Sequence, residues 1–167
     1  MSIGNTFVIA LALTMLWSSS GYPRCVSNPV KVAKTFYTQH HDFYFEDPKT
    51  VSAFVAPRLL ASLKLEHACQ QGELCAIEAV PWTNAQDGEI AEPVTFKAAE
   101  QTGTHAVVEM RYIFVVNESN RRPQQVHLIF ERSEPGACWL LSDLVGPGGN
   151  SLVAHIEHWH KEFGNGR

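Results

Sequence analysis

The strongest constraint on the fold is an alternation of apolar and polar residues in two neighbouring segments, 105–116 and 124–132. Successive side chains of a strand point to opposite faces of a sheet, so each segment predicts a strand with one buried face. The polar stretch 117–123 predicts a hairpin loop between them, and the segments 94–99 and 138–144 predict two further antiparallel strands. In the central pair, the side chains expected to face inward are Ala106, Val108, Met110, Tyr112, Phe114, Val116, Val126, Leu128 and Phe130.

Helical signals precede the predicted sheet and follow it. Asn or Asp followed by Pro is a typical helix start, and such pairs stand at Pro29 and Pro48. The first helix carries apolar residues at helical spacing as far as Tyr44, and the second is short and stops before Pro57, which opens a third. Ser151 is expected to cap a final helix. Helices first and strands second predict an α+β fold, with N-terminal helices packed on a four-stranded antiparallel sheet and a C-terminal helix.

The N-terminus has the pattern of a secretory signal peptide. Residues 7–17 form an apolar run with one threonine, and small residues follow at 18–21. A run of this length is too short for a bilayer span, which needs about 20 residues. We therefore predict that residues 1–20 are removed on export, and that 21–167 form one domain without a membrane span.

The charge distribution argues against two classes of partner. The chain has 13 basic and 17 acidic residues, a net charge of −4, and its basic residues cluster no further than Arg121-Arg122. Nucleic acids and anionic membranes both attract clustered positive charge. Neither is predicted to be a partner of this chain.

Four cysteines predict two disulfides in an exported chain, although four cysteines allow three connectivities. Cys69 and Cys75 enclose a short polar turn with a glycine, so these two are expected to pair locally. Cys25 is then left to pair with Cys138, which would tie the start of the domain to a late strand. Disulfides indicate an oxidising compartment, and we predict that the protein is periplasmic or secreted.

No metal site, cofactor site or catalytic residue is predicted. The cysteines form no CxxC pair, and the histidines of the last helix, His155, His158 and His160, do not make the H-E-x-x-H zinc motif. If all four cysteines are paired, no thiol remains as a nucleophile, and no G-x-S-x-G turn presents a serine. These histidines are expected to lie on a solvated helix face.

An enzyme remains the alternative to a binding protein. Its pocket would lie inside the sheet, with Tyr112, His127 or Asp143 as the polar group. Asp143 has a second expected role, the capping of the turn that follows its strand. Glu109 and Glu131 are expected to face each other on the polar side of the central hairpin, where a surface charge network is favoured over acid–base chemistry.

The segment 76–93 is expected to be a long structured loop and is the best candidate for a binding site. Loops of this length in compact domains are usually functional or disordered, and a tryptophan in the loop argues for order. An aromatic anchor with an acidic rim is typical of protein interfaces. The predicted partner-binding residues are Trp82, Asn84, Gln86, Asp87 and Glu89. The alternative is that the indole only closes one end of the sheet.

Three short motifs resemble a bacterial envelope family of unknown function that includes YbjP-type lipoproteins. The opening helix, with Asn28-Pro29-Val30 before Thr35-Phe36-Tyr37, is similar to that family's first helix. Cys138 to Leu144 is similar to its closing strand, and Ala85-Gln86-Asp87 resembles part of its loop. Val80-Pro81-Trp82 stands where the family has Asp-Pro-Phe.

The resemblance implies a curved, cone-like sheet wrapped on helices, as in nuclear-transport-factor-like and SnoaL-like domains, and no established chemistry. A looser resemblance links the chain to immunity proteins that neutralise cell-wall amidase effectors of type VI secretion. The expected function is therefore a periplasmic binding or inhibitor domain whose partner is an exported protein. An envelope accessory or structural protein is a third possibility.

Overall fold

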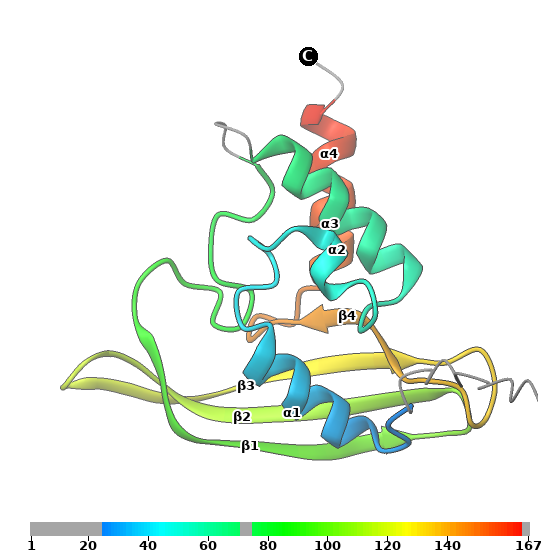
Figure 1. Cartoon of the computed structure of the whole chain (residues 1–167). Helices are drawn as coiled ribbons and strands as arrows, with labels where there is room; N and C mark the ends of the chain where they lie inside the picture. The colour runs from blue at the N-terminus through cyan, green and yellow to red at the C-terminus, as the bar shows by residue number, and fades with distance from the viewer. Residues whose placement is uncertain (1–24, 71–74, 165–167) are drawn as a thin grey trace, which may run out of the picture.

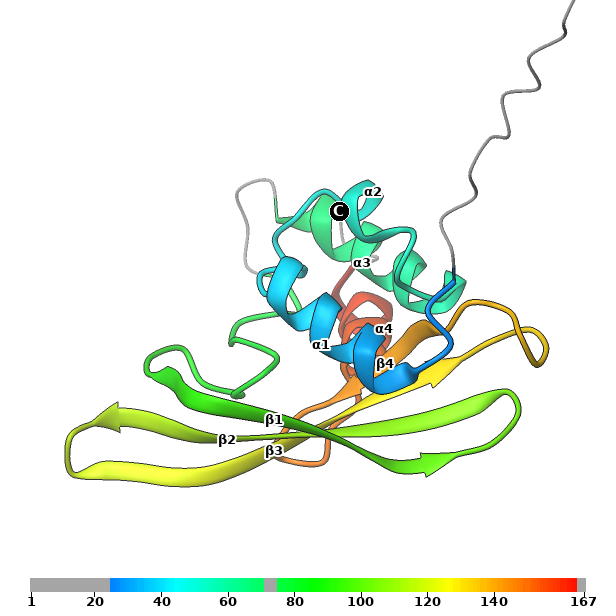
Figure 2. The same cartoon turned by 60° about the horizontal axis from the view of Figure 1, so that its bottom comes forward.

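The predicted strands form one antiparallel sheet in the order β1-β2-β3-β4. The computed structural model describes residues 25–70 and 75–164, so the predicted signal peptide lies outside the described residues. The elements are α1 (Pro29–Gln39), α2 (Pro48–Val51), α3 (Pro57–Cys69), β1 (Glu89–Gln101), β2 (His105–Asn117), β3 (Asn120–Glu131), β4 (Leu140–Val145) and α4 (Leu152–Phe163). The helices all lie on one face of the sheet (Figures 1 and 2). The predicted α+β architecture is confirmed.

The helix starts follow from their caps. The side chain of Asn28 accepts hydrogen bonds from Val30 N and Lys31 N, and Ser151 Oγ accepts one from Ala154 N. The first helix ends earlier than predicted, at Gln39. The chain then turns through residues 40–46, and this turn buries Phe43 and Tyr44 outside any helix.

Strands β1, β2 and β3 are longer than the sequence predicts, whereas β4 begins two residues later than predicted, at Leu140. Pairing of β2 with β3 continues to Asn117 opposite Asn120, so most of the predicted loop 117–123 is strand. Strand β1 begins at Glu89, which moves this residue from the predicted loop into the sheet. Backbone hydrogen bonds of a ladder do not depend on side-chain polarity, so a polar stretch can continue a strand. A register irregularity after Val115 also buries that residue, while Val116 is 45% exposed and does not face inward as predicted.

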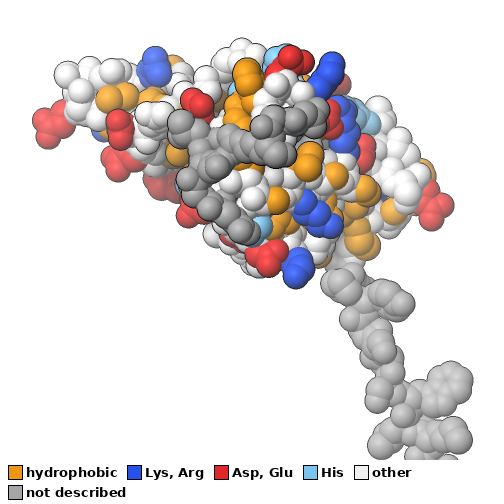
Figure 3. Space-filling view, turned by 90° about the horizontal axis from the view of Figure 1, so that it is seen from above, with side chains coloured by type: hydrophobic (Ala, Val, Ile, Leu, Met, Phe, Trp, Pro, Cys, Tyr) orange, Lys and Arg blue, Asp and Glu red, His pale blue; other side chains and the backbone are white. Residues whose placement is uncertain are grey.

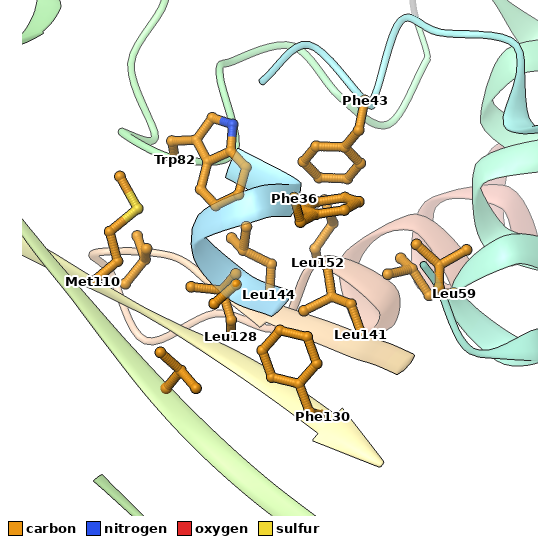
Figure 4. Packing of buried hydrophobic residues seen from close by; sticks show 14 of the residues in the cluster. Phe36, Phe43, Leu59, Trp82, Met110, Leu128, Phe130, Leu141, Leu144 and Leu152 are labelled. Carbon is orange, nitrogen blue, oxygen red and sulfur yellow. The ribbon is translucent and has the colours of Figure 1, made fainter. Parts of the chain in front are cut away.

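The face of the sheet beneath the helices is filled by large side chains. Phe36 of α1, Phe43 and Trp82 pack above Met110, Leu128 and Phe130 of the sheet, as Figure 4 shows. All six are at most 1% exposed. The volume in which the alternative enzyme would have its pocket is therefore occupied by the hydrophobic core.

Two disulfides close the structure, with the predicted partners. The N-terminal disulfide, Cys25–Cys138, holds the segment before α1 against the segment before β4, where Trp139 Nε1 donates a hydrogen bond to Ser27 O at 3.0 Å. The loop disulfide, Cys69–Cys75, closes the connection that leaves α3. Disulfides are typical of proteins that fold in an oxidising compartment outside the cytoplasm. Over residues 25–70 and 75–164, no helix has the length and apolarity to cross a membrane.

Candidate functional site

Trp82 is a core residue, which corrects its predicted role as a surface anchor. The indole is 0% exposed, and its Nε1 donates a hydrogen bond to His41 O at 2.7 Å. Its ring makes edge contacts with Phe43 and Tyr37 at centroid distances of 5.6 and 5.3 Å. A buried, hydrogen-bonded indole offers no surface to a partner, so Trp82 closes one end of the core, as the alternative expected.

The backbone around Trp82 is fixed to the sheet. The Tyr112 hydroxyl donates a hydrogen bond to Trp82 O and lies 2.9 Å from the side-chain oxygen of Gln124. Burial raises the pKa of Tyr112 well above its ordinary value, and the nearby Tyr37 raises it further, so the phenol is protonated at neutral pH. A bridge between Val80 and Ala85 closes the turn that carries the indole. The loop is therefore rigid at its base.

The polar residues that were predicted to bind a partner lie beyond this base and are exposed to solvent. Asn84, Gln86, Asp87 and Glu89 all present their side chains to solvent, and Asn84 has a φ of +51°, a left-handed conformation that Asn adopts more readily than most residues. Within the described part of the chain, Asp87 and Glu89 form no ion pair. Acidic side chains gather toward the left end in Figure 3, the end at which the β2–β3 hairpin turns in Figure 1. The loop is thus a solvated, acidic surface, and its role in binding stays a prediction.

A buried carboxylate that sequence reasoning missed holds the start of the same loop. Glu66 of α3 is 0% exposed, and it accepts hydrogen bonds from Ile77 N at 2.7 Å and Ala76 N at 3.2 Å. His160 of α4 places its Nε2 3.1 Å from the same carboxylate. The signal in the sequence is the spacing of Leu59 and Glu66, which puts the glutamate on the buried stripe of the helix. Glu66 therefore joins α3, α4 and the loop.

An open cavity of about 330 Å³ lies between the loop, the turn after β4 and α4. We call it the apolar cavity, because much of its lining is apolar; it includes Ile77, Pro81, Leu144, Leu152 and Trp159, with Asn84 at one side. His155 also lines it and donates from Nε2 to Ala76 O at 2.7 Å. The volume falls in the range of small-molecule sites. Only Asn84 of the predicted binding residues lines this cavity.

The histidines of α4 have separate roles. His155 binds the Ala76 carbonyl, His160 binds Glu66, and His158 is exposed. Within residues 25–70 and 75–164, no group of three His, Cys, Asp or Glu side chains is arranged to hold a metal ion. The expected solvated face is thus correct for His158 but wrong for His160, which packs between α3 and α4.

The polar residues of the alternative enzyme do not converge. Tyr112 points into the core, whereas His127 lies in the other side-chain row of the sheet, 3.9 Å from Glu109. Asp143 accepts hydrogen bonds from Val153 N and Ser151 Oγ, so its carboxylate caps α4, close to the structural role expected for it. These three residues therefore do not form a shared site, because they lie apart and the carboxylate of Asp143 already accepts hydrogen bonds from α4.

The expected contact between the two glutamates of the central hairpin is also wrong. The β2–β3 register sets Glu109 opposite His127 and Glu131 opposite His105. Glu109 instead pairs with Arg111 on its own strand, at 2.7 Å. The polar face of the hairpin therefore carries a charge network, as expected, but with different partners.

Compared with family models and with curated proteins, the chain matches none. The resemblance to the envelope family stays a prediction.

Proposed function

We propose that the chain is an exported, periplasmic binding domain of the inhibitor type, which docks a protein partner through the segment Asn84–Glu89. The observation that carries the proposal is the contrast between the ends of this loop. Trp82 and Glu66 hold its base in the core, and the following polar residues stand in solvent. A rigid scaffold that presents an exposed loop is a common design of binding proteins, because little conformational freedom is lost on docking.

The negative charge of the loop indicates a partner with a basic surface. Asp87 and Glu89 are exposed and without an ion pair among the described residues, so they are free to attract a basic surface. Unpaired rim charges mainly raise the rate of association, and they do so less at high salt. An effector that degrades the cell wall and carries a basic patch would fit this role, and the domain would then act as its immunity protein.

The test compares association rates at low and high salt. A partner captured from periplasmic extract is purified and measured against wild type and the double variant Asp87→Asn/Glu89→Gln. The matched control is Glu100→Gln/Glu134→Gln, which removes the same charge from exposed sites at the other end of the sheet. We expect the loop variant to associate about tenfold more slowly at low salt, with a weaker salt dependence, and the control to behave as wild type.

Equal association rates for the loop variant and its control would contradict the proposal. Recovery of no partner by wild type from an extract that contains the effector would contradict it as well. Melting curves of all variants are expected to coincide, because the four side chains are on the surface.

A further inference from the structure

A second hollow adjoins the apolar cavity. It has a volume of about 450 Å³ and lies between the Trp82 loop, β3 and the turn after β4. We call it the polar hollow, since its lining includes Thr83, Gln124, Gln125 and Arg122. Asn84 and Gly148 line both hollows. The two hollows are therefore direct neighbours, and these residues lie between them.

The two hollows differ in charge: the lining of the apolar cavity includes the exposed carboxylate of Glu78, whereas no carboxylate lines the polar hollow. Arg122 is the one charged residue among those that line the polar hollow. Its guanidinium lies 5.5 Å from the centroid of the Phe114 ring, and no carboxylate of the described residues lies within 4.0 Å of it. An arginine without a carboxylate partner keeps its N–H donors available for a carboxylate or sulfonate of a ligand. The apolar cavity next to it is suited to a hydrocarbon group.

We propose that the apolar cavity and the polar hollow together bind a small organic anion. The apolar body of the ligand enters the cavity beside Leu152 and Trp159, and its carboxylate or sulfonate meets Arg122. Asn84 lies at the junction, where its amide can hydrogen-bond the ligand between its two ends. This inference does not depend on a protein partner: it shares only Asn84 with the proposed docking segment and does not use Asp87 or Glu89.

Gly148, which lines both hollows, supplies a test. A Cβ at Gly148 would lie 3.4 Å from Asn150 Nδ2 and 3.8 Å from Asn84 Nδ2, which are ordinary contacts. The Cβ of a larger residue therefore fits there without a clash, beside Asn84 and between the two hollows. The variant Gly148→Gln places a polar side chain between the two hollows and adds little apolar surface of its own.

The experiment uses two fluorescent dyes that share an anilinonaphthalene body. One is 8-anilinonaphthalene-1-sulfonate, and the other is N-phenyl-1-naphthylamine, which lacks the sulfonate. We expect wild type to bind the sulfonate dye more tightly, and decanoate to displace it. Arg122→Gln should weaken the sulfonate dye about tenfold and leave the neutral dye unchanged, because only the charged hydrogen bond is lost. Gly148→Gln should weaken both dyes.

Arg121→Gln is the matched control for the charge. Arg121 pairs with Val115 across the sheet and does not line the polar hollow, so its loss removes the same charge one residue away. We expect the control to bind both dyes as wild type does, and Arg122→Lys to recover most of the affinity for the sulfonate dye. Melting curves of each variant exclude dye binding to unfolded chains.

Three results would overturn the inference. Wild type could bind the two dyes equally, Arg121→Gln could weaken the sulfonate dye as much as Arg122→Gln, or Gly148→Gln could bind both dyes as wild type does. None of these results bears on the proposed protein partner, which is tested with Asp87 and Glu89. Loss of partner binding with intact dye binding, or the reverse, therefore separates the two proposals.

Discussion

Glu66→Ala is expected to be among the most destabilising single substitutions outside the hydrophobic core. The variant removes an acceptor that is 0% exposed and leaves Ala76 N, Ile77 N and His160 Nε2 without it. An unpaired buried donor costs about 1–3 kcal/mol, and the loss of one partner from a buried polar pair costs about 3–5 kcal/mol. Because Ala76 is 2% exposed, water replaces few of these bonds. We therefore expect the free energy of unfolding to fall by about 4 kcal/mol.

The variant Glu66→Gln separates the contributions of the individual hydrogen bonds to this loss in the free energy of unfolding. A glutamine keeps a carbonyl oxygen that can accept from Ile77 N, now at 2.7 Å, but its amide group cannot accept from Ala76 N as well. The expected loss is about 2 kcal/mol, half that of the alanine variant. The control is Glu162→Ala, which removes an exposed carboxylate from α4 and should change stability by less than about 0.5 kcal/mol.

Urea unfolding followed by circular dichroism measures the three variants against wild type. Thermal unfolding should show a fall in Tm of about 12 °C for Glu66→Ala, at about 3 °C per kcal/mol for a domain of this size. Native-state hydrogen exchange should also lose protection at the amides of Ala76 and Ile77, which a general loss of stability alone would not single out. If Glu66→Ala and Glu162→Ala are equally stable, the carboxylate does not hold the loop, and the reasoning fails.

Three further outcomes follow from the structure. The free energy of unfolding should fall as the pH rises above about 10. The unfolded chain then ionises its tyrosines, while the raised pKa keeps Tyr112 protonated in the folded state. Urea unfolding between pH 8 and 11 should show a smaller fall for Tyr112→Phe than for wild type. Replacing both cysteines of the N-terminal disulfide by serine should cost about 5 kcal/mol and replacing those of the loop disulfide about 2 kcal/mol, since the sequence separations are 113 and 6; equal losses in urea unfolding would contradict the loop-length argument. Trp82→Ala should lower the free energy of unfolding by about 4 kcal/mol, as expected for a large aromatic in the core, and a Tm within 2 °C of wild type would show instead that the indole is dispensable.

The sequence alone determined the class and order of the elements. Apolar alternation in 105–116 and the caps at Asn28 and Ser151 depend on residues close together in the chain, so they could be interpreted locally. The ends of the elements were less well predicted. Polar residues at 117–123 look like a loop, but the ladder continues through them because its hydrogen bonds are made by the backbone.

The disulfides and the exposed loop were also accessible from the sequence. Cys69 and Cys75 are near enough to pair through a short turn, and this left one choice for the remaining two cysteines. The polarity of Gln86, Asp87 and Glu89 placed them in solvent. Charged and amide side chains are mostly exposed in folded proteins, so this placement needed little tertiary information, although the same loop buries Thr83.

Only the tertiary structure decided which residues around the loop are available for binding. Trp82 suits both an interface and a core. It is a core residue here because the rings of Tyr37 and Phe43 pack on its indole and the backbone carbonyl of His41, 41 positions away, accepts a hydrogen bond from its Nε1. The carboxylate of Glu66 lies 3.1 Å from Nε2 of His160, 94 positions away. The two hollows are neighbours at Asn84 and Gly148, which are also far apart in the sequence. The sequence carries no local record of such contacts, because their partners become neighbours only when the helices pack on the sheet.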